Sequence, residues 1–337
     1  MEEFSERVGL SRPTVSRYFN DPSSVRKKTR EIIEEAIKKS GYRPNMLAVN
    51  LNRRRGNIIG LIVPQWLDPF FMALIRRIEI IANDAGFQTF VLSSDGKPEK
   101  EDEAVKTFRS MNVAGAIIAP IGRTTGHREK FGGDIPLVFV DAPLDEDTAF
   151  VGTDNRQSFG LIVDYLCRSG EPPAFFGMPD VNVNAGERRK AYIETMEKLS
   201  HAPHIIDISP SATWDFEQFA FDEASRIFGS KLKPFNQTII CANDRIAFGV
   251  IAAAWRKGLK VGHGRDCDVR VAGHDDHPLS QYAWPPITTV AQNYNEIGRL
   301  AIGLLLRKLG EDPHLDDVRL SRDRVLLTAE LMLRKSA

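Results

Sequence analysis

A short stretch near the N-terminus combines arginines and small hydroxyl side chains at a spacing suited to contacting a nucleic acid. Val15 and Phe19 stand four residues apart, so they share one face of a predicted helix, which we expect to be buried. The outward positions of that helix are Arg12, Thr14, Ser16 and Arg17. An arginine guanidinium can form two parallel hydrogen bonds with guanine, and serine and threonine hydroxyls can hold phosphates. These side chains therefore indicate contact with a DNA major groove.

Two helices separated by a tight turn are predicted to position these side chains. Phe4 and Val8 share one face of a first helix, and Gly9 and Leu10 then provide the turn. Ser11 is expected to cap the second helix, whose first turn tolerates a proline such as Pro13. The pattern is that of a helix, a turn and a second helix.

A third helix is predicted from Lys27 to Ser40, with Ile33, Ala36 and Ile37 facing inward and Gly41 ending it. Three short helices are sufficient for a minimal DNA-reading domain. Because any three-helix bundle can show this spacing, the pattern alone leaves a purely structural bundle open as the alternative.

The charge of the chain is unevenly distributed. Its 337 residues carry no net formal charge, yet residues 1–56 hold 13 Lys/Arg against 7 Asp/Glu, a net charge of +6. The remaining residues hold 32 against 38, a net charge of −6. Because phosphate contacts dominate nucleic-acid affinity, this asymmetry predicts a polyanionic partner for the first module only. A solvated basic terminus is the alternative that charge by itself leaves open.

Sequence motifs in this module resemble the headpiece of LacI/GalR-family repressors. The runs GLSRPTVSRYFND and VRKKTREIIEEAIKKSGYRPNMLAVNL match the family pattern G-x-S-x-x-T-V-S-R-x-x-N, then T-R-x-x-V, Y-x-P-N and A-x-x-L, at almost every element. The resemblance implies that residues 1–44 form a helix-turn-helix headpiece that binds a double-stranded DNA operator. It assigns base-reading positions to Arg12, Pro13 and Arg17, and backbone-positioning ones to Ser11, Thr14, Ser16 and Asn20. Two departures are Arg26, where the family has a serine cap, and the missing threonine cap upstream of Phe4.

The resemblance also implies that residues 45–56 form a hinge helix and linker. In the family this helix folds on the operator and inserts a leucine into the minor groove, which kinks the duplex. Asn45, Ala48 and Leu51 are the DNA-contacting residues implied here, with Leu51 as the inserted leucine. A flexible basic linker is the alternative, because Arg53-Arg54-Arg55-Gly56 has the composition of one. The glycine-free run before it favours a helix.

From Ile58 onward the chain alternates short apolar runs with longer amphipathic stretches. The runs IIGLIV, QTFVLS, GAIIAP, PLVFVD, AFFGM, HIIDI, TIICA and VRVAG predict buried strands, most of them followed by helices. This alternation is typical of parallel α/β folds. Because these strands are more than a single sheet would readily hold, we expect two Rossmann-like lobes with a ligand cleft at the carboxyl ends of the strands.

This second module resembles the periplasmic-binding-protein-like core of the same regulators. The matching runs are IGLIVPQWLDPFF, VGTDN, CANDRIAFG, VAGHDD and PPITTVAQNYNEIG. In that family the chain crosses three times between the lobes, which implies an effector-binding and dimerisation core over residues 57–337. Lobe 1 is expected to comprise residues 57–156 and 289–320, and lobe 2 residues 157–288 and 321–337. The expected fold class is thus an all-α headpiece followed by a two-lobed α/β core.

The resemblance places eight residues in the cleft as effector contacts. They are Asp68, Phe70, Phe71, Arg188, Trp214, Asn243, Asp275 and Gln292. Carboxylate, amide and guanidinium groups can bracket vicinal hydroxyls, while aromatic rings cover the apolar face of a pyranose. A sugar is therefore the expected effector, and a purine, which uses the same stacking, is the alternative. Each residue also has a structural alternative, such as a core position for Phe70 or a salt bridge between Arg188 and Asp275.

An enzyme and a transport receptor are the competing classes. The sequence has no GxGxxG after its first predicted strand, no P-loop, no GxSxG and no HExxH, so we expect no catalytic residues and no cofactor. The run His274-Asp275-Asp276-His277 has metal-ligand residue types, but it follows a strand where the family has an aromatic residue and two aspartates, so no metal is expected. Cys167, Cys241 and Cys267 are too widely spaced to indicate a disulfide framework.

The sequence predicts no membrane partner. No apolar run approaches the roughly 20 residues that span a bilayer, and the opening run MEEFSERVGL lacks the features of a signal peptide. A cytoplasmic location is therefore expected, which argues against a transport receptor.

The resemblance finally implies a homodimer that places two headpieces on a pseudo-palindromic operator. Effector binding is then expected to change the angle between the lobes and the separation of the hinges. Induction is the commoner family behaviour, and corepression is the alternative. The final run AELMLRKSA carries no heptad segment to build a tetramer, so a dimer is expected. Repression of carbohydrate-metabolism genes is implied by the resemblance alone.

Overall fold

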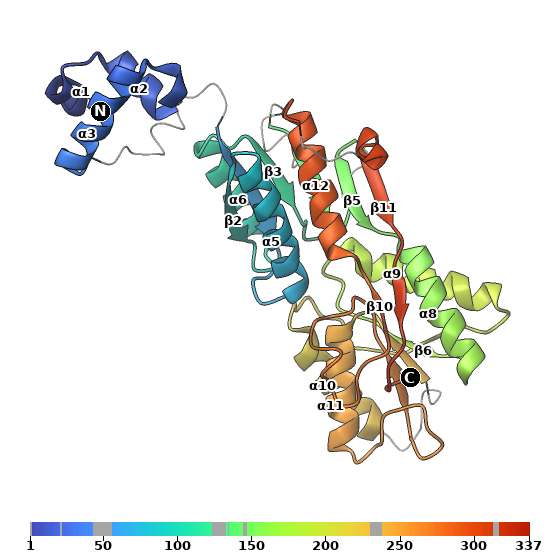
Figure 1. The fold of residues 1–337 in the computed structure, drawn as a ribbon. Coiled ribbons are helices and arrows are strands. Elements are labelled where there is room, and N and C mark those ends of the chain that lie inside the picture. The colour runs from blue at the N-terminus through green and yellow to red at the C-terminus, as the bar shows by residue number, and fades with distance from the viewer. Residues whose placement is uncertain are drawn as a thin grey trace.

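The computed structural model describes residues 2–20, 22–42, 56–122, 133, 135–143, 147–229, 238–312 and 317–337. The predicted hinge contacts Asn45, Ala48 and Leu51 lie outside these ranges. Figure 1 shows a small helical headpiece followed by two larger α/β lobes.

The headpiece consists of α1 (Glu2–Val8), α2 (Arg12–Asn20) and α3 (Lys27–Ser40), with a short 3₁₀ turn η1 (Pro22–Ser24) between the last two. The three predicted helices are therefore present, and α3 ends where expected, at Gly41 with a φ of 61°. Phe4, Val15, Tyr18 and Ile33 form the headpiece core. Arg26 at the start of α3 makes no side-chain cap hydrogen bond, as its replacement of serine suggested.

Lobe 1 is built on a six-stranded parallel sheet in the order β11-β5-β4-β3-β1-β2. The strands are β1 (Ile58–Val63), β2 (Gln88–Ser93), β3 (Gly115–Ile118), β4 (Leu137–Val140), β5 (Ala149–Thr153) and β11 (Arg324–Leu327). One set of inward side chains packs against α5 (Pro69–Asp84) and α12 (Tyr294–Lys308), and another against α6 (Pro98–Ser110). The sheet is thus buried between helical layers, as the continuous apolar runs predicted.

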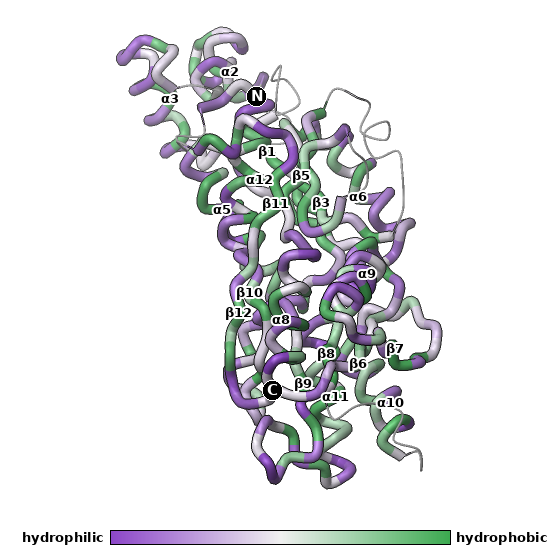
Figure 2. Tube along the Cα trace, turned by 90° about the vertical axis from the view of Figure 1, so that its right-hand side faces the viewer, coloured by the Kyte–Doolittle hydropathy of each residue, from purple (hydrophilic) through white to green (hydrophobic). Residues whose placement is uncertain are grey.

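Lobe 2 is built on a four-stranded parallel sheet in the order β7-β6-β8-β9. Its strands are β6 (Ala174–Phe176), β7 (His204–Ile205), β8 (Thr238–Cys241) and β9 (Arg270–Ala272). Two helix pairs pack around this sheet in Figure 1: α8 (Asn155–Ser169) with α9 (Val183–Lys198), and α10 (Phe216–Gly229) with α11 (Asp244–Arg256). Figure 2 shows the strands of both lobes as mostly hydrophobic segments inside more polar helices.

A small antiparallel pair of strands, β10 (Thr289–Ala291) and β12 (Glu330–Met332), lies where the chain passes between the lobes. The expected lobe boundaries need one correction here. Strand β11, preceded by the 3₁₀ turn η2 (Val318–Ser321), pairs with β5 in the lobe 1 sheet, so the last crossing follows Leu327 and does not lie at residue 320. β11 is an edge strand with alternating exposure, and its four residues do not form the continuous apolar run that identified the other strands.

The contact between α10 and α11 depends on a glycine, which provides a test of the lobe 2 packing. A Cβ at Gly249 would lie 2.4 Å from the Glu217 carbonyl oxygen and 2.7 Å from the Ala220 Cβ. We expect Gly249→Ala to lower the free energy of unfolding by about 1–3 kcal/mol, because backbone and a short side chain cannot move aside cheaply. Thermal and urea unfolding measure this change.

Gly186→Ala is the matched control. Gly186 lies in α9, and a Cβ there would meet nothing within 4 Å. Because alanine favours helices over glycine by up to about 1 kcal/mol, this variant should be as stable as the parent protein or more stable. Equal effects of the two substitutions would contradict the described packing.

Candidate functional site

A polar cleft lies between the two lobes, close to the carboxyl ends of several strands. It holds about 370 Å³ of empty space, part of it open to solvent. All eight residues that the sequence assigned to effector contact line this one cleft: Asp68, Phe70, Phe71, Arg188, Trp214, Asn243, Asp275 and Gln292. The structure therefore brings the complete predicted set together, from segments more than 200 residues apart.

Five further residues line the cleft that the sequence analysis did not single out. They are Asp141, Met178, Asn182, Asn184 and Phe216. Asp141 directly follows β4, so the rule that ligands bind at the carboxyl ends of parallel strands could have found it. Met178 ends the apolar run AFFGM that predicted β6, so the same rule could have found it. Asn182 and Asn184 lie at the start of α9 and Phe216 begins α10, away from any predicted strand end.

The carboxylate of Asp275 forms the centre of the polar network. Its Oδ1 atom accepts hydrogen bonds from Arg188 Nη2 at 2.9 Å, His274 Nδ1 at 2.8 Å and Gln292 Nε2 at 2.7 Å. Burial by itself raises the pKa of Asp275, but these three partners outweigh burial and lower the pKa to about 2. Asp275 is therefore ionised at neutral pH, and its Oδ2 atom has no hydrogen-bond partner among the described residues.

His274 supports Asp275 as a neutral imidazole. Burial and the nearby Arg188 charge lower the pKa of His274 to about 4. Its Nδ1 donates to Asp275, which makes Nε2, 2.9 Å from the Ser158 hydroxyl, the acceptor of that second hydrogen bond. The ring also stacks on Phe159, with 5.0 Å between centroids. These contacts fix the orientation of the imidazole.

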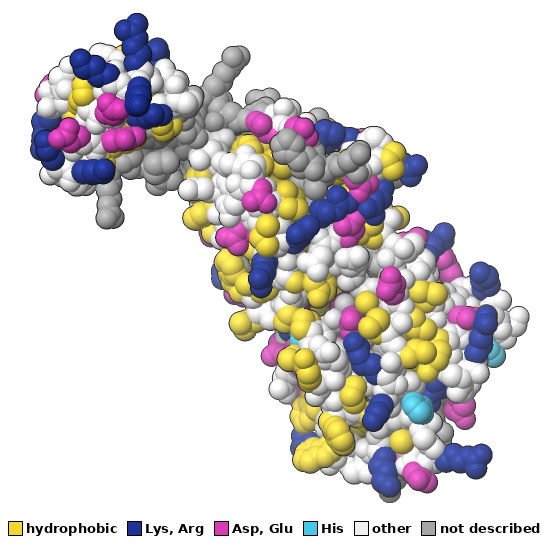
Figure 3. Space-filling model, in the orientation of Figure 1, with side chains coloured by type: hydrophobic (Ala, Val, Ile, Leu, Met, Phe, Trp, Pro, Cys, Tyr) yellow, Lys and Arg dark blue, Asp and Glu magenta, His cyan; other side chains and the backbone are white. Residues whose placement is uncertain are grey.

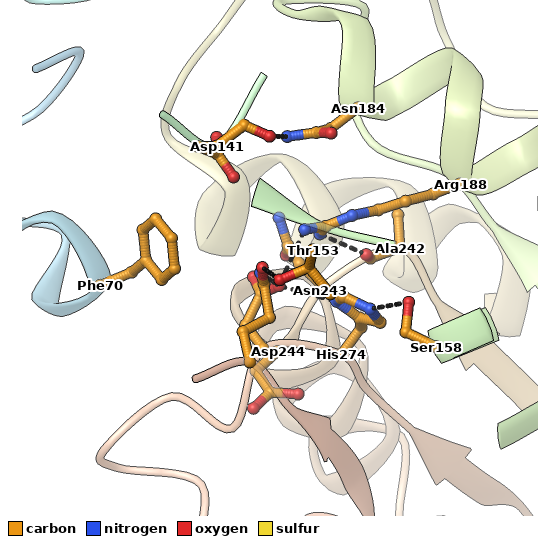
Figure 4. Close-up of polar contacts among 12 residues, drawn as sticks. Phe70, Asp141, Thr153, Ser158, Asn184, Arg188, Ala242, Asn243, Asp244 and His274 are labelled. Atoms are coloured by element: carbon orange, nitrogen blue, oxygen red, sulfur yellow. Dashed lines mark hydrogen bonds and ion pairs between the residues drawn. The ribbon is translucent and has the colours of Figure 1, made fainter. Parts of the chain in front are cut away.

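Arg188 reaches the cleft from α9 and is almost fully buried. Its Nη1 donates to the Ala242 carbonyl oxygen at 2.9 Å (Figure 4), and its Nη2 donates to Asp275. Its Nε is buried without a hydrogen-bond partner in the described part of the chain. The guanidinium thus ties α9 to the ends of β8 and β9.

A short chain of hydrogen bonds joins the two lobes through the floor of the cleft. The Thr153 hydroxyl at the end of β5 donates to Gln292 Oε1 at 2.5 Å. Gln292 Nε2 in turn donates to Asp275 in lobe 2. Because all three side chains are largely buried, the orientation of one lobe is linked to the position of Asp275 in the other.

A second connection between the lobes lies at the rim of the cleft. Asp68 caps α5 by accepting a hydrogen bond from the Phe70 amide at 3.0 Å, and its other oxygen lies 3.4 Å from Arg245 Nη1 on α11. Arg245 also binds both oxygens of Glu217, at 2.7 and 2.6 Å. Arg245 therefore bridges Asp68 of lobe 1 and Glu217 of lobe 2.

The apolar part of the cleft is aromatic and also spans both lobes. Phe70 at the start of α5 makes edge contacts with Phe71 and Tyr294. Trp214 stacks on Phe216 in lobe 2, and its indole is so close to Gly96 of lobe 1 that a Cβ there would lie 2.1 Å from Trp214 Cδ1. A flat ligand face can therefore meet rings from either lobe.

Asp141 presents a third carboxyl group to the cleft. It has a φ of 67°, in the left-handed region that aspartate and asparagine adopt more readily than most residues other than glycine. Figure 4 shows Asp141, Phe70 and Arg188 pointing toward one another across the cleft. Burial raises the pKa of Asp141 to about 7, with Asp275 and Asp68 adding to the rise and Arg188 opposing it.

The histidine and aspartate side chains of residues 274–277 form hydrogen bonds and an ion pair with other groups of the protein. His274 is held by Asp275 and Ser158, and His277 Nδ1 accepts a hydrogen bond from the Leu279 amide at 3.0 Å. Asp276 lies 2.7 Å from Arg334. Among the described residues, no group of three or more His, Cys, Asp or Glu side chains is placed to hold a metal ion.

The predicted DNA-reading side chains lie on and before α2. Ser11, Arg12, Pro13 and Arg17 are exposed, while Thr14 and Ser16 are half-buried. The Ser11 hydroxyl lies 2.8 Å from that of Thr14 and caps the helix start, as expected. Asn20 ends the helix, and its side chain is not described. The two arginines are thus available to an external partner.

Comparisons with known proteins agree with this architecture. Residues 1–45 match the bacterial regulatory proteins of the lacI family, and residues 164–337 match the periplasmic binding protein-like domain. The chain is 27% identical to the ribose operon repressor of Escherichia coli (strain K12), covering 100% of this chain and 99% of that one. It is 26% identical to the HTH-type transcriptional repressor PurR of Histophilus somni (strain 129Pt), covering 100% and 98%.

A solved structure shows the same fold. The crystal structure of the Lac repressor dimer bound to operator and the anti-inducer ONPF matches with a TM-score of 0.81 and 24% identity, covering 99% of this chain and 97% of that one.

A helix-turn-helix headpiece and a two-lobed core with a polar cleft define a ligand-responsive DNA-binding regulator. The chain belongs to the lacI family of bacterial transcriptional regulators. None of its described helices is long and apolar enough to cross a membrane.

The network around Asp275 predicts a large effect on stability. We expect Asp275→Ala to lower the free energy of unfolding by about 3–5 kcal/mol, because it leaves the buried Arg188 guanidinium without its counter-charge. Asp323→Ala is the matched control, since Asp323 pairs with Arg307 and Lys308 at the surface and should cost less than about 1 kcal/mol. Urea unfolding of the three proteins makes the comparison, and similar losses for both variants would contradict the central role of Asp275.

Proposed function

We propose that this regulator is a repressor that binds an operator through α2 and changes its operator affinity when a sugar occupies the cleft. The observation that carries the proposal is the convergence of three carboxyl groups, four amides, a guanidinium and two sets of aromatic rings between the two lobes. Its action on DNA places the protein in the cytoplasm, and the genes it controls belong to carbohydrate metabolism.

The chemistry of the cleft favours a polyhydroxylated ligand. Each sugar hydroxyl both donates and accepts a hydrogen bond, and it finds acceptors in Asp275 Oδ2 and Asp141 and an amide in Asn243. Asn243 uses Oδ1 to cap α11, which leaves Nδ2 facing Met178 at 3.7 Å in the cleft wall. Phe70 and Trp214 supply flat apolar surfaces for the ring carbons.

A purine remains the second candidate because one relative is a repressor named PurR. The stacking surfaces suit either ligand. Three carboxyl groups, however, offer more acceptors than the few donor groups of a purine base can use. The excess of acceptors therefore favours the sugar.

The operator contacts follow from the exposed face of α2. Arg12 and Arg17 are the side chains able to read base edges, while Ser11, Thr14, Ser16 and Asn20 hold phosphates. Pro13 offers no side-chain donor and fixes the first turn of the helix. Residues 45–56, with Asn45, Ala48 and Leu51, are proposed as the hinge that enters the minor groove.

A homodimer on a pseudo-palindromic operator completes the proposal. Exposed apolar side chains gather along one side of both lobes (Figure 3). They include Met72 and Ile80 on α5, Trp255 on α11, and Tyr282 and Trp284 in the loop that follows β9. An apolar surface of this kind is typical of an interface between subunits. A second copy of the chain seated there would set the spacing of the two headpieces.

The test measures ligand binding and operator binding in the same samples. Thermal shift against a panel of monosaccharides, disaccharides and purines should give specific stabilisation by a sugar, since a ligand that binds only the folded state raises Tm. The same sugar should change operator affinity about 5- to 150-fold in fluorescence anisotropy, downward for induction and upward for corepression.

Phe70→Ala and Phe90→Ala form the matched pair for this test. Both phenylalanines are partly exposed in lobe 1, but Phe70 lines the cleft and Phe90 lies on β2 against Phe108. We expect Phe70→Ala to weaken sugar binding at least tenfold, because it removes a stacking surface, and Phe90→Ala to leave binding unchanged. Stabilisation by purines alone, or equal weakening by both variants, would refute the proposed site.

A further inference from the structure

The charges that face the cleft are predominantly negative. Asp68, Asp141 and Asp275 are its acidic residues, and Arg188 is its one basic residue among the described lining side chains. Arg188 is already committed to Asp275 and to the Ala242 carbonyl oxygen. The described lining of the cleft therefore has no cation without an acidic partner.

Arg245, which lies beside the cleft, does not offset the negative charge of the cleft. It is held by both oxygens of Glu217 and by Asp68, and its guanidinium packs over the Phe216 ring at 4.9 Å. Glu217 cancels its charge locally. Because Coulomb interactions are strong in partly buried sites, a phosphate or carboxylate placed here would face unbalanced negative charge.

We propose that the cleft selects an uncharged sugar and rejects the phosphorylated or carboxylated forms of that sugar, and that Asp141 is the residue that enforces the rejection. This inference rests on the proposed function and names the chemical class of its ligand. Asp68 and Asp275 are each tied to an arginine, at 3.4 and 2.9 Å, whereas Asp141 has no such ion pair among the described residues. Arg188 lowers the pKa of Asp141 but is paired with Asp275, so Asp141 is the carboxyl group that an anionic ligand meets without a directly bound cation among the described residues.

The protonation state of Asp141 makes the rejection of anionic ligands depend on pH. Arg188 on α9, Asp275 after β9 and Asp68 before α5 shift its pKa, and Asn184 Nδ2 donates a hydrogen bond to its carbonyl oxygen at 3.3 Å. Asp141 also borders a neighbouring pocket, whose charged lining residues are Asp154, Arg156, Glu187, Arg322 and Arg324. Because the pKa of Asp141 is raised to about 7, the group is largely neutral at pH 6 and largely ionised at pH 8. Rejection of an anionic ligand should therefore strengthen as pH rises across this range, whereas binding of the uncharged sugar should change less.

The experiment compares each sugar with its charged forms by isothermal titration calorimetry on the full-length protein. The probes are D-glucose, D-galactose and D-ribose, each with its terminal phosphate, and the uronic acids of the two hexoses. For whichever of these sugars binds, we expect the uncharged form to bind at least 100-fold more tightly than its phosphate or uronic acid at pH 8. This ratio of affinities should be smaller at pH 6.

Asp141→Asn is the informative variant, because asparagine is the residue that best tolerates a positive φ after glycine. It should reduce the selectivity ratio at pH 8 at least tenfold. For the uronic acids, whose carboxylates stay ionised from pH 6 to pH 8, it should also remove the pH dependence of that ratio. Asp222→Asn on the exposed face of α10 is the control and should alter neither.

Two results would overturn the inference. If a phosphate or uronic acid binds as tightly as its uncharged partner, and Phe70→Ala abolishes that binding, the cleft is the effector site but its charge does not select the ligand. If selectivity for the uncharged sugar persists unchanged in Asp141→Asn, Asp141 is not the residue responsible. Failure of the proposed function itself is distinguishable, because binding would then be insensitive to Phe70→Ala.

Discussion

One carboxylate oxygen, Asp275 Oδ1, accepts hydrogen bonds from an arginine, a histidine and a glutamine, and the geometry of the cleft depends on it. Arg188 and His274 come from lobe 2, and Gln292 begins the return of the chain to lobe 1. A buried charge is tolerated only when it is paired and hydrogen-bonded, so these partners must stay in place together. The same carboxylate keeps Oδ2 for a ligand. The stability of the cleft and the recognition of the ligand thus both depend on Asp275.

Two further contacts between the lobes also include residues of the cleft. Arg245 bridges to Asp68 at the rim, while Trp214 packs on Gly96. A ligand that binds Asp68 or the indole of Trp214 necessarily competes with, or adds to, contacts between the lobes. Such differential contact is what allows a ligand to shift a conformational equilibrium. The fold therefore needs no separate transmission element between the cleft and the lobe that carries the headpiece.

Most of the fold and of the site was predictable from sequence for identifiable reasons. Buried strands such as IIGLIV and TIICA are continuous apolar runs, and family motifs located the eight cleft residues. β11 was missed because an edge strand of four residues, half of them exposed, has no such run. The pairing of Asp68 with Arg245 and the raised pKa of Asp141 could not be predicted, because contacts across 177 residues, and the desolvation of a single carboxyl group, depend on tertiary structure. Sequence patterns report which faces are buried, and only packing determines which charges are left unpaired.

The hydrogen-bond path from Asp275 through Gln292 to Thr153 is expected to couple ligand binding to operator affinity. Thr153→Val isolates this path, because it keeps the shape of a side chain that does not line the cleft and removes only the hydroxyl bound to Gln292. The measurement is operator affinity with and without the effector sugar, alongside the Kd of that sugar. We predict that the sugar Kd changes less than about threefold while the effector-induced change in operator affinity falls at least fivefold, a loss of about 1 kcal/mol of coupling. An unchanged effector response in a variant that still binds the sugar would contradict the account.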